Sequence, residues 1–263
     1  MTRLVSGIIL ALSMLALILY GTATHFFWFT MVVSAIGAYE FFGMLKSGGR
    51  PSPMLAGVPA AAGVTAVLYM GSGQQATMAI LTLSMLAACV AVFGDHKDRL
   101  AAGAYLAFGA LFTGAPMAAL ALIRGAYDGQ GFVTMLIAAT ALCDTAAYYT
   151  GRKFGKVKLA PALSPGKTVE GFVGGVVGAV AGALIVWRLM IPSFGFLEAV
   201  ISGLLVGALG PIGDLAESAI KRNTGVKDSG NIIPGHGGVL DRVDSLLFTS
   251  AAFYLFLQLR SML

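Results

Sequence analysis

Charged residues are scarce in this sequence: Asp, Glu, Lys and Arg together make up 11% of its 263 residues. A soluble domain has about 25% charged residues, so most of this chain does not face water. Cysteine is also rare, and Cys89 and Cys143 lie far apart in apolar runs. We interpret both as small buried hydrophobic residues, which excludes a metal site built from paired cysteines. No basic segment is large enough to follow a nucleic-acid backbone, so we expect no nucleic-acid partner.

Apolar residues and glycine are abundant, at 57% hydrophobic residues and 35 glycines. A membrane-spanning helix needs about 20 mostly apolar residues, and small residues let such helices approach one another closely. We therefore predict an all-α integral membrane protein, a polytopic bundle of about nine transmembrane helices. The first span lacks a convincing small-residue cleavage site, so we interpret it as a retained helix and not as a signal peptide. The predicted spans are residues 4–20, 24–45, 54–71, 76–94, 100–123, 131–150, 169–191, 197–213 and 246–262.

Lysine and arginine are distributed unevenly over the predicted loops. Nine spans place Arg124, Arg188 and Arg260 on one side of the membrane and the other fourteen of the 17 basic residues on the opposite side. Cytoplasmic loops of membrane proteins collect Lys and Arg, so the side with fourteen is predicted to be cytoplasmic. The loops expected there are residues 46–53, 95–99, 151–168 and 221–241.

Polar residues concentrate between Gly213 and Ser245. Asp214, Ser218 and Lys221 have the i, i+4, i+7 spacing of one helix face, with Glu217 beside them. Five glycines and one proline then interrupt residues 225–238, and Asp241 and Asp244 follow one helical turn apart. Carboxylates on both sides of a basic, glycine-rich loop favour a divalent metal with bound phosphate, on the cytoplasmic side of the membrane. The alternative, a set of interfacial salt bridges, explains poorly why Asp214 and Asp241 lie at apolar boundaries.

Two further acidic residues lie inside apolar runs. Asp144 is expected to face the interior of the bundle, and a functional role is the default for such a residue. Glu40 lies near the end of a predicted span, and we favour its interpretation as an interfacial residue. The chain is accordingly divided into residues 1–125, about five chemically sparse transmembrane helices, and residues 126–263, the catalytic transmembrane region.

The polar segments resemble those of a known family. Residues 218–244 read Ser218-x-x-Lys221-Arg222-x4-Lys227-Asp228-x-Gly230-x2-Ile233-Pro234-x-His236-Gly237-Gly238-x2-Asp241-Arg242-x-Asp244. This pattern resembles the signature of phosphatidate cytidylyltransferases, also called CDP-diacylglycerol synthases. Two earlier segments are similar to the family as well: Asp144-x3-Tyr148-x2-Gly151-Arg152-x2-Gly155 and Leu163-Ser164-Pro165-x-Lys167-Thr168-x-Glu170-Gly171.

The resemblance implies that CTP and phosphatidic acid react to give CDP-diacylglycerol and pyrophosphate, in phospholipid biosynthesis at a bacterial cytoplasmic (inner) membrane. It implies Mg²⁺ or Mn²⁺ held by Asp214 and Asp241, with Glu217 and Asp244 as further or supporting ligands. The expected catalytic residues are Asp214, Asp241, Asp144, Lys221, Arg222 and His236. The expected substrate-binding residues are Ser164, Lys167, Thr168, Lys227, Asp228, Gly237, Gly238 and Arg242. The sequence leaves open whether a monovalent cation joins the divalent one and whether the protein forms a homodimer.

Two other functions fit parts of the pattern. A CTP-dependent lipid kinase of the polyprenol or phytol type is similar in parts and would transfer a phosphoryl group. An ion-coupled transporter could use Asp144, Glu40 and Asp214 as an ion path, with glycine-rich helices that pack closely. The polar residues crowd one side of the membrane, whereas a transporter site lies near the midplane, so the transporter is the weaker alternative.

Overall fold

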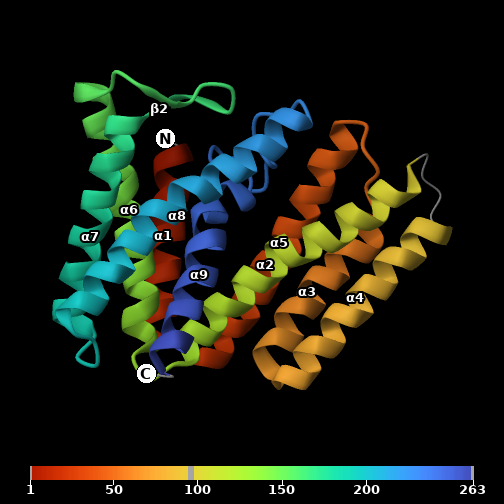
Figure 1. The fold of residues 1–263 in the computed structure, drawn as a ribbon, viewed down its shortest axis with the longest axis horizontal. Coiled ribbons are helices and arrows are strands. Elements are labelled where there is room, and N and C mark those ends of the chain that lie inside the picture. The colour runs from red at the N-terminus through yellow and green to blue at the C-terminus, as the bar shows by residue number, and fades with distance from the viewer. Residues whose placement is uncertain (1, 94–97, 262–263) are drawn as a thin grey trace. The chain divides into compact units, whose positions relative to one another are not determined.

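A computed structural model describes residues 2–93 and 98–261, so part of the predicted loop 95–99 lies outside the described residues. The described chain contains nine helices and one two-stranded hairpin (Figure 1). The elements are α1 (Thr2–Tyr20), α2 (Ala23–Ser47), α3 (Met54–Met70), α4 (Gly73–Phe93), α5 (Arg99–Gly125), α6 (Gly129–Phe154), β1 (Lys158–Ala160), β2 (Ser164–Thr168), α7 (Val169–Met190), α8 (Phe196–Asn223) and α9 (Leu240–Ser261).

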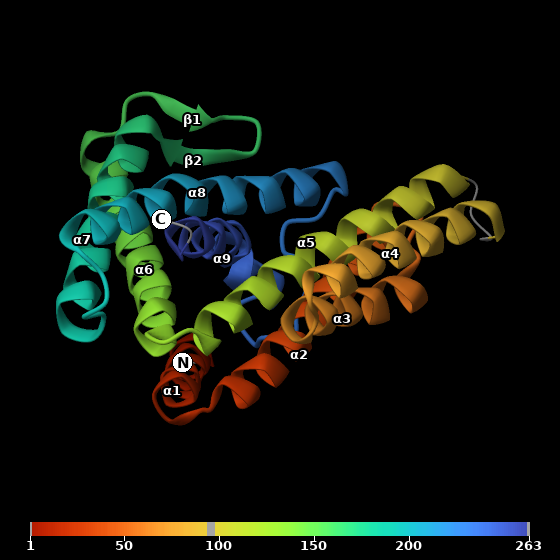
Figure 2. The ribbon, with the colours of Figure 1, turned by 60° about the horizontal axis from the view of Figure 1, so that its bottom comes forward.

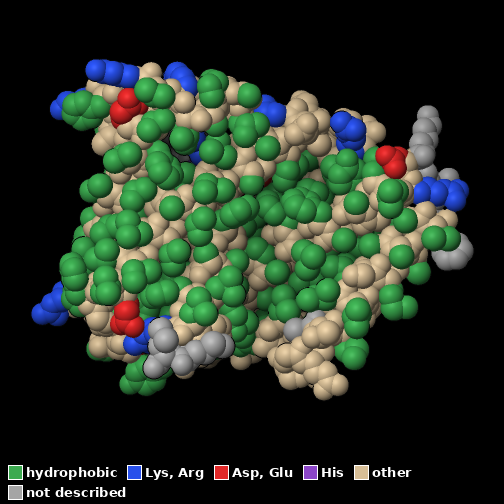
Figure 3. Space-filling view, viewed as in Figure 1, with side chains coloured by type: hydrophobic (Ala, Val, Ile, Leu, Met, Phe, Trp, Pro, Cys, Tyr) green, Lys and Arg blue, Asp and Glu red, His purple; other side chains and the backbone are tan. Residues whose placement is uncertain are grey.

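The all-α membrane fold predicted from the sequence is confirmed. Six helices, α2 and α4 to α8, are long and apolar enough to cross a membrane. The apolar helices α1 and α3 are shorter, and α9 is the least apolar of the nine described helices. Hydrophobic side chains cover the flanks of the helices, and many charged side chains gather near helix ends (Figure 3). This distribution suits a hydrocarbon layer bounded by water.

Regular structure extends into two polar segments. The apolar span predicted to end at residue 213 lies in helix α8, which continues to Asn223, as the helical spacing of Asp214, Ser218 and Lys221 predicts. The segment 151–168 was expected to be a loop, but it contains an antiparallel hairpin in which Lys158 pairs with Thr168. Both segments place polar residues on regular backbone, where their positions are better defined than in a loop.

The chain forms two compact units. Unit 1 contains Met1–Leu122 and Ile220–Val243, and unit 2 contains Ile123–Ala219 and Asp244–Leu263. Most of the signature segment 218–244 therefore packs in the same unit as the first five helices. Helices α8 and α9 each contribute residues to both units.

In unit 1, α2 to α5 lie side by side in both ribbon views (Figures 1 and 2). Phe41 and Phe42 of α2 are fully buried. A Cβ on Gly57 of α3 would lie 2.1 Å from the Phe42 ring, and one on Gly109 of α5 would lie 2.6 Å from the Phe41 ring. These two glycines thus make room for the rings, which is how small residues let neighbouring helices pack closely.

In unit 2, the glycines of α7 form its contact with α6. A Cβ on Gly174 would lie 2.2 Å from the Thr150 hydroxyl, and one on Gly178 would lie 2.5 Å from the Leu142 carbonyl oxygen. Glycines that recur about once per turn let two helix backbones approach closely without a hydrophobic driving force. The cytoplasmic end predicted for α6, which carries Asp144, is thereby held against the start of α7.

Candidate active site

A cavity of about 530 Å³ in unit 2 collects several residues that the sequence singled out. Its wall is formed by helix α6, the β1–β2 hairpin, the start of α7 and the polar part of α8. Figure 2 shows the hairpin at the end of α6 and α7. The polar and charged residues that line the cavity are Asp144, Tyr148, Arg152, Ser164, Lys167, Thr168 and Asp214.

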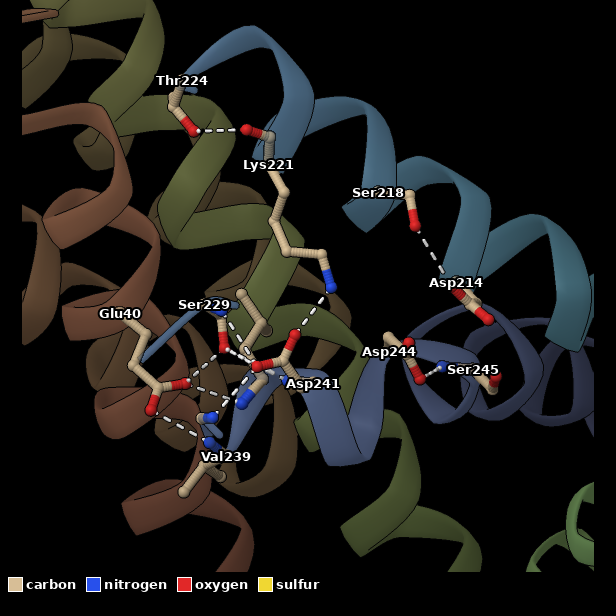
Figure 4. Close-up of polar contacts among 12 residues, drawn as sticks. Glu40, Asp214, Ser218, Lys221, Thr224, Ser229, Val239, Asp241, Asp244 and Ser245 are labelled. Atoms are coloured by element: carbon tan, nitrogen blue, oxygen red, sulfur yellow. Dashed lines mark hydrogen bonds and ion pairs between the residues drawn. The ribbon is translucent and has the colours of Figure 1, made fainter. Parts of the chain in front are cut away.

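Two acidic residues, one lysine and one arginine carry the charge in this cavity wall. Lys167 Nζ lies 2.7 Å from Asp214 Oδ2, and the Ser218 hydroxyl donates a hydrogen bond of 3.3 Å to Asp214 Oδ1 (Figure 4). Asp144 is exposed and lines the same cavity. The Lys167 and Asp214 side chains are 26% and 36% exposed, so both remain accessible to a ligand. Asp144 thus lies in the cavity wall, and its orientation toward the interior of the bundle stays a prediction.

The backbone around Lys167 is held by local hydrogen bonds. Thr168 is the N-cap of α7, and its hydroxyl accepts a hydrogen bond of 3.1 Å from the Gly171 amide. The Glu170 carboxylate accepts hydrogen bonds from the Lys156 and Val157 amides, at 3.0 and 3.3 Å. These contacts join the end of α6, the hairpin and the start of α7. The Lys167 side chain therefore leaves from a fixed point beside the cavity.

A second cluster lies in unit 1, where α9 begins. Lys221 Nζ lies 2.6 Å from Asp241 Oδ1. Asp241 Oδ2 accepts hydrogen bonds from the Ser229 amide and hydroxyl, both at 2.9 Å, and from the Gly238 amide at 3.0 Å (Figure 4). Burial alone raises the pKa of Asp241, but the bonds from Lys221, Gly238 and Ser229 outweigh it and lower the pKa to about 2. Asp241 is therefore ionised at neutral pH and ties two parts of the loop together.

The interpretation of Glu40 as an interfacial residue is wrong. Its side chain is only 2% exposed. Glu40 Oε1 accepts a hydrogen bond of 2.9 Å from the Val239 amide, and Oε2 accepts one of 2.7 Å from the Leu240 amide. Oε2 also lies 3.2 Å from the Ser229 hydroxyl, whose single proton it shares with Asp241 Oδ2. Burial of a carboxylate is costly unless donors surround it, and these donors supply that compensation. In the sequence, Glu40 stood out as a lone acidic residue in an apolar run. Nothing in the sequence marked Ser229 as its partner.

The rest of the loop surrounds a second cavity, of about 590 Å³, also in unit 1. His236 belongs to its wall, and the His236 Nδ1 atom lies 2.9 Å from the Ser6 hydroxyl of α1. Gly235 and Gly237 have φ angles of +77° and +83°, which residues other than glycine rarely adopt. The predicted site residues on this wall are Asp228, His236, Gly237 and Arg242.

The remaining predicted residues are dispersed. Arg222 and Lys227 are exposed, and Glu217 is fully buried. Asp214 belongs to unit 2 and Asp241 to unit 1, and their joint metal binding stays a prediction. Within residues 2–93 and 98–261, no three His, Cys, Asp or Glu side chains form a group that could bind an ion.

Comparison with known proteins identifies the family. The sequence profile of the cytidylyltransferase family matches residues 1–260. The chain belongs to this family. The profile spans nearly the whole chain, so membership includes the N-terminal helices, which carry no recognisable motif.

Several known proteins are similar to parts of this chain. The phosphatidate cytidylyltransferase of Brucella suis is 42% identical over 180 residues, which are 68% of this chain and 66% of the relative. That of Bacillus subtilis is 48% identical over 121 residues, 45% of this chain and 44% of the relative. The uncharacterized protein YnbB of Escherichia coli is 47% identical over 130 residues, 49% of this chain and 43% of the relative. The matches thus span less than two thirds of these relatives.

Proposed function

We propose that this membrane protein transfers a cytidylyl group from CTP to phosphatidic acid. The observation that carries the proposal is the cavity in which Lys167, Asp214 and Asp144 meet, in a chain of the cytidylyltransferase family. Two of the relatives above are named phosphatidate cytidylyltransferase. A cavity of about 530 Å³ lies in the range of sites that bind small molecules.

The proposed reaction forms one phosphorus–oxygen bond and breaks another. A phosphate oxygen of phosphatidic acid attacks the α-phosphorus of CTP, and the bond from that phosphorus to the β-phosphate oxygen breaks. The products are CDP-diacylglycerol and pyrophosphate. Because the attacking phosphate is already anionic, the protein supplies position and positive charge more than a strong base. Lys167 and Arg152, both in the cavity wall, are placed to neutralise phosphate oxygens.

The oxygen atoms in this cavity suit a magnesium or manganese ion. Magnesium takes oxygen ligands, commonly one or two carboxylates together with substrate phosphates. Asp144 and Asp214 line one cavity and present carboxylate oxygens to it, so they would hold the ion. When bound, it would screen the charge of the triphosphate and of the leaving pyrophosphate. Asp241, which the sequence predicts as a metal ligand together with Asp214, would contribute through the loop that it holds together.

The cavity is proposed to face the cytoplasm of a bacterial cell, at its inner membrane. The bias of Lys and Arg toward the loops that include residues 151–168 supports this orientation. Both CTP and the site would then be on the same side of the membrane, with phosphatidic acid reaching the cavity from the bilayer.

The test is a product analysis with purified protein in phosphatidic-acid vesicles. Each nucleoside triphosphate is supplied in turn, with Mg²⁺ and then with a chelator. CDP-diacylglycerol and pyrophosphate, formed from CTP and only with the divalent ion, are the expected products. Release of CDP together with a phosphorylated lipid alcohol would show a kinase and refute the proposal, as would the absence of any lipid-linked cytidine.

A further inference from the structure

The buried carboxylate of Glu40 lies outside every segment that resembles the cytidylyltransferase signature. It belongs to α2, yet the residues that donate hydrogen bonds to it lie 189 to 200 positions later in the chain. All of these residues are in unit 1, so the contacts lie within one compact unit. A carboxylate that is 2% exposed and accepts hydrogen bonds on both oxygens has a defined position.

The contacts of Glu40 fall at two separate points of the glycine-rich loop. One is Ser229, near the start of the loop, and the other is the pair Val239 and Leu240, where the loop becomes α9. Asp241 connects the same two regions through Ser229 and Gly238. The two carboxylates thus hold the start and the end of the segment between residues 229 and 239 close together. Figure 4 shows them on either side of Ser229.

The glycines near Glu40 indicate how closely the loop packs against it. A Cβ on Gly230 would lie 2.6 Å from Glu40 Oε1. A Cβ on Gly238 would lie 2.0 Å from the Ser229 hydroxyl and 2.6 Å from Glu40 Oε2. Each of these distances is shorter than a van der Waals contact, so only glycine leaves room for the carboxylate at these two positions.

We infer that Glu40 is a positioning residue for substrate binding: it holds the loop of residues 229–239 in the conformation that presents Asp228, His236 and Arg242 to their cavity. The inference rests on the proposed function, since the resemblance to phosphatidate cytidylyltransferases implies that Asp228, Gly237, Gly238 and Arg242 bind the substrate. Glu40 itself need not touch the substrate. Its contribution comes through the backbone amides and the serine hydroxyl that it fixes.

The carboxylate is required because both of its oxygens act as acceptors. In Glu40→Gln the amide keeps one acceptor oxygen, but its NH₂ group points a donor at a backbone N–H. Loss of a hydrogen bond to a charged group corresponds to about a tenfold to hundredfold change in an equilibrium. We therefore expect amide exchange in residues 226–239 to become about ten to a hundred times faster in this variant, with little change elsewhere.

The test combines hydrogen–deuterium exchange with kinetics, on the full-length protein in nanodiscs. The matched control is Glu198→Gln, because Glu198 also accepts bonds from a backbone amide and an arginine, Gly195 and Arg260, but belongs to unit 2, whereas the loop belongs to unit 1. Ser229→Ala removes a hydroxyl that contacts both Glu40 and Asp241, but it leaves the Val239 and Leu240 bonds to Glu40 in place, so it should give a smaller increase in exchange. It also keeps the test decisive if Glu40→Gln does not fold.

Kinetics distinguish a positioning role from a loss of folded protein. A fraction of unfolded enzyme lowers the apparent kcat and leaves KM unchanged, whereas a loosened loop should raise KM for CTP or phosphatidic acid about tenfold or more. Unchanged exchange in residues 226–239, or faster exchange with unchanged KM for both substrates, would overturn the inference. If the wild type makes no CDP-diacylglycerol, the proposed function fails, and the exchange measurement still decides whether Glu40 holds the loop.

Discussion

Replacement of Lys167 by methionine tests whether the cavity in unit 2 binds the nucleotide. Lys167 Nζ lies 2.7 Å from Asp214 Oδ2, and both side chains are partly exposed, at 26% and 36%. Ion pairs of this kind contribute about 0.2–1 kcal/mol to stability. Lys167→Met should therefore lower the free energy of unfolding by at most about 1 kcal/mol, a shift of only a few degrees in Tm.

The effect of Lys167→Met on CTP binding should be much larger. If Lys167 moves from Asp214 to a phosphate oxygen when CTP binds, the variant loses a charge-assisted hydrogen bond of about 1.5–3 kcal/mol. The KM for CTP should then rise about tenfold to a hundredfold. In the absence of nucleotide, Mn²⁺ should bind the variant more tightly than the wild type, because the competing ammonium group has left Asp214.

The assays are steady-state kinetics with varied CTP and Mn²⁺ titration followed by electron paramagnetic resonance. Lys153→Met is the control. Lys153 lies beside Arg152 in the last turn of α6 and packs over the Phe154 ring, but it does not line the cavity. A wild-type KM for CTP in Lys167→Met, with the stability change given above, would show that Lys167 is a topology signal only. Weaker Mn²⁺ binding in this variant would refute the idea that the lysine competes with a cation for Asp214.

Three further predictions follow from the same structure. Asp214→Asn should abolish turnover with little loss of stability. Asp241→Asn should abolish turnover and also lower the free energy of unfolding by about 3 kcal/mol, because it breaks an ion pair whose side chains are only 11% and 9% exposed. Activity assays and chemical denaturation would separate the two effects. Gly178→Leu should prevent α6 and α7 from packing, since even a Cβ there would lie 2.5 Å from a carbonyl oxygen. The yield of folded protein should therefore fall sharply, and a normal yield would contradict the packing described. Single cysteines at positions 156 and 227 should both react with a membrane-impermeant reagent from the cytoplasmic side only, and labelling from opposite sides would refute the predicted topology.

The sequence predicted the helices well because each apolar run can satisfy its backbone only as a helix in the membrane. It also predicted that Lys167, Thr168 and Asp214 belong to a site, and the structure places all three in one cavity wall. The helical spacing of Asp214, Ser218 and Lys221 also predicted that the helix continues past residue 213. The polar residues after Gly213 lack a breaker until Gly225, so α8 extends about ten residues beyond its apolar part.

Long-range contacts could not be predicted from residue spacing. The hairpin of β1 and β2 has only short strands, one of which contains Pro165, and neither has the alternating pattern that marks a strand. Glu40 was misinterpreted for a related reason: a lone acid near a helix end is equally compatible with an interfacial position and with a distant partner. Its partner Ser229 lies 189 residues away, and nothing in the local pattern connects them.

The buried carboxylate of Glu40 also changes how the chemically sparse helices should be understood. Residues 220–243 pack in the unit formed by the first 122 residues, and a side chain from α2 reaches both regions of the signature loop. An isolated glycine-rich loop would lose a large conformational entropy on ordering, because glycine is the most flexible residue. The hydrogen bonds to Asp241 offset part of that entropy within the loop and its flanking helices, and the bonds to Glu40 add a contribution that exists only when α2 and the loop pack together. The geometry of the signature is thus a property of both parts of the chain, although its recognisable residues all lie in the second.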